Sequence, residues 1–106
     1  MEKWKLDKSY YFKLLKLVYN VKYNKDILLF EELVNLVDKE TKTIHLSVNL
    51  RETLREKTNM NKPNFSASLK RLTETELLSG EKGSYSINSK VLLDLEIINY
   101  IEISLK

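Results

Sequence analysis

The chain of 106 residues is long enough for one modest domain, and we expect residues 1–106 to form that single domain. It has no cysteine and one histidine, His45, so thiolate metal sites and the usual nucleophile and base pairs are excluded. We therefore expect no enzyme, no metal and no cofactor. The lack of cysteine and of a long apolar stretch indicates a cytoplasmic protein with no membrane partner.

The net charge is only +3, but the charged residues are arranged in blocks. Residues 1–25 hold seven lysines and two acids, and residues 49–72 hold six Lys or Arg and two acids. The segments 26–48 and 73–106 each have three more acids than bases. Such a polarised distribution suits a polyanion on one side of the protein, with solvated helix faces as the alternative.

Residues 10–23, YYFKLLKLVYNVKY, predict a helix capped by Asp7 or Ser9, whose apolar surface is interrupted by a single polar stripe. The apolar tail after Ser89 reads as a helix or, near its end, as a strand. These two segments hold more apolar surface than one small domain covers, so we expect a homodimer, with a buried intradomain helix as the alternative. The expected interface residues are Tyr11, Leu15, Tyr19, Leu95, Ile98 and Ile101.

Residues 26–40 predict a helix capped by Asp26, with a strand as the competing interpretation, and residues 43–47, TIHLS, predict a short strand. A helix should follow, capped by Asn49 with Glu52 completing a capping box, and with Leu50 and Leu54 facing inward. Residues 58–61 predict a tight turn, because asparagine tolerates left-handed backbone conformations.

A second helix is expected to begin near Pro63, with Phe65, Leu69 and Leu72 facing inward at helical spacing. Its opposite face carries cations, amides and small side chains, and no acid lies between Lys57 and Glu74. Residues 77–88 then predict a two-stranded hairpin closed by residues 81–83.

The segment FSASLKRLTETELLSGEKGSYSIN, residues 65–88, resembles the recognition helix and wing of winged helix-turn-helix DNA-binding proteins. Its end, GSYSIN, is similar to the wing strand of plasmid replication initiators and related plasmid or phage regulators. The expected fold is therefore α+β, mainly α: a winged helix-turn-helix with an extra N-terminal helix and an apolar C-terminal element.

The leading hypothesis is sequence-specific binding of double-stranded DNA by a homodimer. The protein would be a plasmid-borne accessory factor for replication, partition or conjugative transfer, with other plasmid-encoded proteins as partners, or a transcriptional regulator. The expected DNA-contacting residues are Lys62, Asn64, Ser66, Lys70 and Arg71 in the groove, Lys82, Ser84 and Tyr85 in the wing, and Lys5, Arg55 and Lys57 on phosphates. In a variant of this hypothesis, the second helix forms the dimer contact and the wing and basic N-terminus hold DNA. The alternative is a protein-interaction module of the same fold that binds no nucleic acid.

Overall fold

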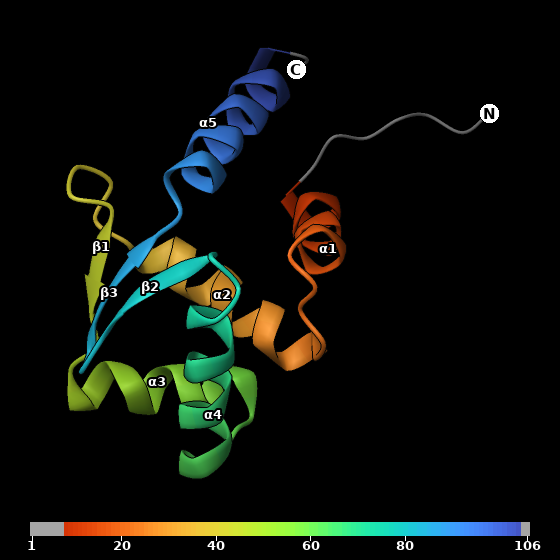
Figure 1. Ribbon diagram of the computed structural model, residues 1–106. Coiled ribbons are helices and arrows are strands. Elements are labelled where there is room, and N and C mark those ends of the chain that lie inside the picture. The colour runs from red at the N-terminus through yellow and green to blue at the C-terminus, as the bar shows by residue number, and fades with distance from the viewer. Residues whose placement is uncertain (1–7, 105–106) are drawn as a thin grey trace.

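The computed structural model describes residues 8–104, with side chains to residue 101, as five helices and a small antiparallel sheet (Figure 1). This confirms the expected α+β, mainly helical class. In chain order the elements are α1 (Lys8–Val18), α2 (Asn24–Leu36), β1 (Thr43–His45), α3 (Val48–Thr58), α4 (Lys62–Thr73), β2 (Leu78–Glu81), β3 (Ser84–Ile87) and α5 (Ser89–Ser104).

Helix α2 is the central element of the core and packs against α1, α3 and α4. Its Leu29, Phe30 and Leu33 side chains are completely buried, and the Phe12 ring of α1 meets Phe30 edge-on at 6.1 Å between centroids. The prediction of a helix rather than a strand is confirmed, but its bounds are earlier than expected. Asp26 lies inside the first turn instead of capping it.

The α3–turn–α4 unit largely follows its predicted local signals. Asn59 adopts the left-handed conformation (φ 55°, ψ 49°), and the Asn61 side chain accepts a hydrogen bond from the Asn64 amide at 2.9 Å ahead of α4. The predicted cap of α3 is wrong, because Ser47 Oγ, and not the side chain of Asn49, accepts a hydrogen bond from the amide of Leu50 at 3.1 Å. The helix therefore begins at Val48.

The sheet has the order β1-β3-β2, and both pairings are antiparallel. The predicted strand within residues 43–47 is confirmed, and Ile44 lies opposite Tyr85. Lys82 and Gly83 join β2 to β3 with positive φ values of 55° and 87°. Positive φ at both central residues defines the two-residue turn whose twist matches that of paired strands.

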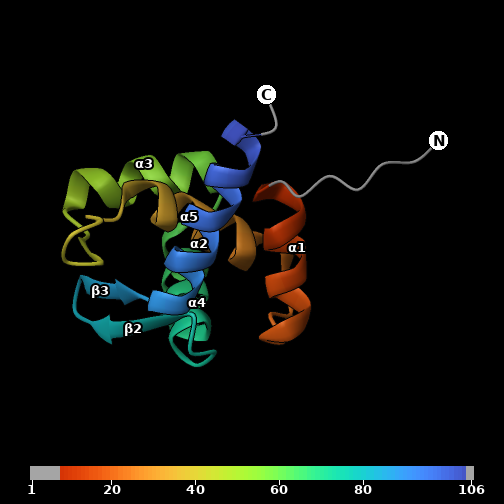
Figure 2. The ribbon, with the colours of Figure 1, turned by 90° about the horizontal axis from the view of Figure 1, so that it is seen from above.

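The tail forms one helix, which settles the choice between helix and strand for residues 89–104. Asn88 Oδ1 accepts from the Lys90 amide at 2.8 Å as the helix begins. Seen from above, α5 lies beside α1 (Figure 2), and Tyr11 Oη donates a hydrogen bond to Asp94 Oδ2 at 2.8 Å. This bond joins α1 to α5.

The Tyr11–Asp94 bond gives the protein a predicted response to high pH. Burial, and then the hydrogen bond to Asp94, raise the pKa of Tyr11 above its ordinary value. The unfolded chain therefore loses this proton first, so the stabilisation is fully present below about pH 10 and declines as the pH rises further. We expect Tyr11→Phe to flatten the fall of unfolding free energy with pH in this range, measured by urea titration. An unchanged slope would contradict this.

Candidate nucleic-acid interface

The exposed face of α4 carries the polar side chains that the sequence placed there. Phe65, Leu69 and Leu72 are 1%, 3% and 0% exposed, so the helix is anchored by the predicted inward face. On the outside, the residues Lys62, Asn64, Ser66 and Lys70 are exposed together. Amides, hydroxyls and cations on one helix face are the groups that contact phosphates and base edges.

A hollow lies between this face, α3 and the β2–β3 hairpin. Arg51, Lys70 and Lys82 reach its edge from three different elements, and Ser66 and Thr73 add hydroxyl groups. The remaining lining residues are Leu69, Gly80, Glu81 and Tyr85. Three positively charged side chains around hydroxyl donors favour the binding of an anion. Glu81 is the single acid in the lining, so the positive charges outnumber the negative one.

Arg51 was not among the residues predicted to contact DNA. It belongs to the basic block of residues 49–72, but its position depends on the hairpin folding back onto α3. One terminal nitrogen of Arg51 lies within 3.8 Å of the position that a Cβ atom on Gly83 would occupy. The excess of positive charge in residues 49–72 could have pointed to Arg51. The contact between α3 and the hairpin turn could not be predicted from local sequence.

The hairpin residues fall into two groups. Lys82 and Ser84 are exposed, as a contact with DNA requires. Tyr85, expected to touch DNA, is only 8% exposed, because alternate residues of β3 point into the core. Its ring is part of the core, and only its small exposed part borders the hollow.

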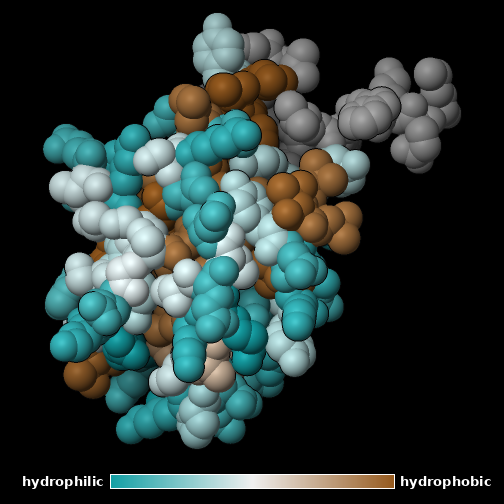
Figure 3. Space-filling model, in the orientation of Figure 1, coloured by the Kyte–Doolittle hydropathy of each residue, from teal (hydrophilic) through white to brown (hydrophobic). Residues whose placement is uncertain are grey.

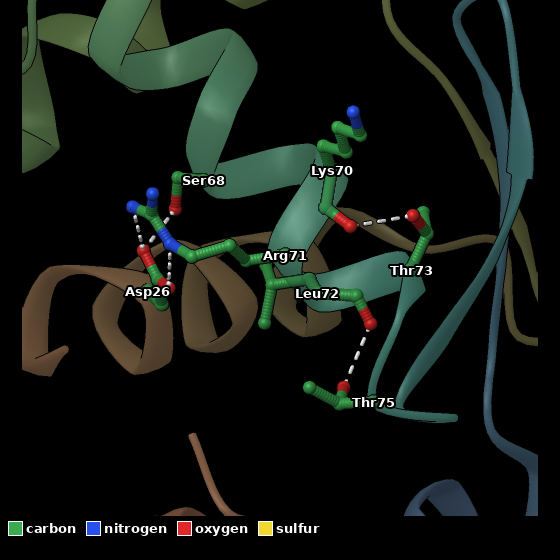
Figure 4. Close-up of polar contacts among 7 residues, drawn as sticks. All are labelled: Asp26, Ser68, Lys70, Arg71, Leu72, Thr73 and Thr75. Carbon is green, nitrogen blue, oxygen red and sulfur yellow. Dashed lines mark hydrogen bonds and ion pairs between the residues drawn. The ribbon is translucent and has the colours of Figure 1, made fainter. Parts of the chain in front are cut away.

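Arg71 is held by a buried carboxylate, although its side chain remains partly exposed. Its Nε donates to Asp26 Oδ2 at 2.7 Å and its Nη2 donates to Asp26 Oδ1 at 2.9 Å, while Ser68 Oγ donates to Oδ1 at 2.6 Å (Figure 4). Its guanidinium also lies 4.5 Å from the centroid of the Tyr23 ring. The hydrogen bond to Asp26 raises the pKa of Arg71. The residue predicted to contact DNA therefore joins α4 to α2.

Two further predicted phosphate contacts have partners within the chain. Lys57 Nζ lies 3.5 Å from Glu32 Oε1 of α2, although more than half of the lysine side chain remains exposed. Arg55 Nε donates to the carbonyl of Met60 at 3.3 Å and so braces the turn before α4. Lys5 lies outside the described residues.

Three of the six residues expected at a dimer interface are buried within one chain. Leu15, Leu95 and Ile98 are 4%, 6% and 4% exposed, because α1 and α5 bury these faces against the chain itself. Tyr11, Tyr19 and Ile101 are half-buried. The three leucine and isoleucine positions therefore need no second copy to cover them.

Searches of protein-family models, of curated proteins and of solved structures found no match to this chain. Within residues 8–104, none of the helices combines the length and the apolar character that crossing a membrane requires.

Proposed function

We propose that the chain is a winged helix-turn-helix protein that binds double-stranded DNA sequence-specifically as a cytoplasmic homodimer. The observation that carries the proposal is the acid-free, exposed face of α4 next to a hollow edged by Arg51, Lys70 and Lys82. In this proposal Asn64 and Ser66 face base edges, and the three cations hold phosphates. The biological setting proposed is that of a plasmid-borne accessory factor or transcriptional regulator, which the resemblance to plasmid initiators supports.

The first test is a titration of the purified chain against the DNA upstream of its own gene and against a scrambled duplex, at several salt concentrations. We expect tighter binding to its own DNA and a steep loss of affinity with salt, because each phosphate contact releases counterions. A chain that binds neither duplex even at low salt would contradict the proposal.

Variants separate the two kinds of contact. Arg51→Gln, Lys70→Gln and Lys82→Gln should each weaken binding to both duplexes about fivefold and lower the salt slope by about one. Asn64→Ala should instead reduce the preference for the specific duplex, by about 1–3 kcal/mol. The matched control is Lys39→Gln, an exposed lysine outside the α4 face and the hollow. Equal losses in all four lysine and arginine variants would indicate that net charge, not this surface, determines binding.

One observation favours the second candidate, a protein-interaction module. Leu17, Val18 and Tyr100 are more than 70% exposed, and large apolar side chains gathered on a surface are typical of protein contacts. Binding that is insensitive to salt, or absent for DNA, would place this function first.

A further inference from the structure

The outer faces of α1 and α5 expose apolar side chains that the described residues leave uncovered. On α1, Leu17 and Val18 are 76% and 74% exposed and Leu14 is 38% exposed. On α5, Tyr100, Leu93 and Ile97 are 71%, 56% and 49% exposed. Figure 3 shows apolar surface gathered over both helices. Each helix thus has a buried apolar face and a second, exposed one.

The two exposed faces have the same spacing and opposite charge. On α1, Lys13 is followed by Leu14 and Leu17, at one and four positions further on. On α5, Glu96 is followed by Ile97 and Tyr100 at the same two distances. The whole of α1 holds three lysines and no acid, whereas α5 holds one lysine and three acids. Two helices with this pattern each offer apolar side chains and carry opposite charges, so they can pair as complementary faces.

The two exposed apolar faces lie next to each other, on either side of the hydrogen bond between Tyr11 and Asp94. Leu14 and Val18 follow Tyr11 at helical spacing, and Ile97 follows Asp94, so the apolar faces flank the Tyr11–Asp94 hydrogen bond. Helical geometry then places Lys13 at the far edge of the α1 face and Glu96 at the far edge of the α5 face. The surface therefore has apolar side chains on both sides of the Tyr11–Asp94 hydrogen bond and charged residues at its rim, and a charged rim around apolar side chains is typical of protein interfaces.

We infer that this surface, termed the α1/α5 face, binds a second copy of the chain, with α1 of each protomer against α5 of its partner. A two-fold axis forms both helix pairs at once, because each copy presents one basic and one acidic helix. Neither Lys13 nor Glu96 forms an ion pair with another residue of the described chain, so both are available. This interface deepens the homodimer of the proposed function, but no part of it depends on DNA.

The experiment measures molecular mass by light scattering and analytical ultracentrifugation on the full chain. The wild type should be a dimer at micromolar concentration. Leu17→Glu, at a largely exposed position, should weaken dimerisation at least about a hundredfold, since it places a charge among the apolar side chains of the α1 face. The matched control is Val48→Glu, because Val48 is 73% exposed on α3, away from this face, and should leave the mass unchanged.

Charge reversal then tests the pairing of α1 with α5. Lys13→Glu and Glu96→Lys should each weaken self-association about tenfold, because each converts two attractive contacts into repulsive ones. Mixing the two variants should restore the dimer, because one helix pair would then hold the two reversed charges and the other the two native ones, and both pairs attract. Circular dichroism checks folding, which matters for Glu96 because it lines a separate pocket together with Lys8, Lys39 and Lys42.

A wild-type chain that stays monomeric at about 100 µM, where an interface of micromolar affinity would be occupied, would overturn the inference. So would a dimer whose mass is unchanged by Leu17→Glu, or single variants that the mixture does not rescue. None of these results would remove DNA binding, which a monomer can also perform. Conversely, a chain that dimerises as expected but binds no DNA would retain this interface and lose the proposed function.

Discussion

Asp26→Ala is expected to lower the free energy of unfolding by about 3 kcal/mol, measured by urea denaturation. Asp26 is 1% exposed, and its carboxylate accepts three hydrogen bonds, one from Ser68 and two from Arg71. Its removal leaves the completely buried Ser68 hydroxyl without its acceptor. The Arg71 side chain is 39% exposed and can be partly hydrated, which keeps the loss at the lower end of the range for broken buried pairs.

The control for Asp26→Ala is a substitution in a more exposed ion pair, which joins α2 to α3. Glu32 of α2 pairs with Lys57, and the two side chains are 30% and 55% exposed. Glu32→Ala should therefore cost less than about 1 kcal/mol. A double-mutant cycle of Asp26 and Arg71 should show strong coupling. Similar small losses for Asp26→Ala and Glu32→Ala would mean that the buried cluster does not stabilise the α2–α4 contact.

Gly80→Ala should cost more than about 2 kcal/mol and distort the hairpin, as measured by urea denaturation and by backbone NMR shifts of β3. Gly80 has a φ of +116°, and a Cβ atom there would lie 2.3 Å from the carbonyl oxygen of Ser84 on the opposite strand. That oxygen belongs to the backbone of the neighbouring strand, so it cannot move without disrupting the pairing. In the proposed complex, Gly80→Ala should also weaken DNA binding by displacing Lys82.

Gly83→Ala is the matched control, since Gly83 also has a positive φ, +87°, but a Cβ there would be no closer than 3.5 Å to any neighbour. It should therefore show a smaller loss, due to the backbone conformation alone. Equal losses for the two substitutions would mean that the close approach of the strands at Gly80 is unimportant.

Local signals predicted the α4 region well. Three features there depend only on residues close to one another in the sequence. They are the inward spacing of Phe65, Leu69 and Leu72, the left-handed conformation of Asn59, and the two strands of the hairpin. The start of α3 was harder, because Ser47 and Asn49 are both competent caps two residues apart. The choice depends on the end of the strand, where the Leu46 amide bonds to the carbonyl of Gly83.

The role of Arg71 could not be read from helical spacing. Asp26 lies 45 residues earlier, and a helix pattern cannot show which neighbour a residue at the edge of a face will meet. A signal was nevertheless present in Ser68, a polar residue three positions after Phe65 on the inward side of α4. A buried hydroxyl requires a hydrogen-bond partner, so Ser68 predicts a polar group on the helix that faces it.

The sequence also could not predict which side of α1 would be buried and which would be exposed. Its apolar residues extend almost all the way round, so Leu15 and Leu17 were equally plausible contact residues. In the fold Leu15 belongs to the core, whereas Leu17 is exposed. The expectation of excess apolar surface agrees with the exposed residues Leu14, Leu17 and Val18, whereas the predicted contact residue Leu15 is buried and Tyr11 lies at the edge of the exposed face.

The lengths of α4 and the hairpin limit how much DNA one copy of the chain could cover. Twelve residues of helix extend about 18 Å, and a four-residue strand extends about 13 Å. At about 3.4 Å per base pair, α4 spans roughly five base pairs, well short of one helical turn of B-DNA. A two-fold dimer would therefore read a short inverted repeat, and the separation of its two arms would be set by the α1/α5 face rather than by either hairpin.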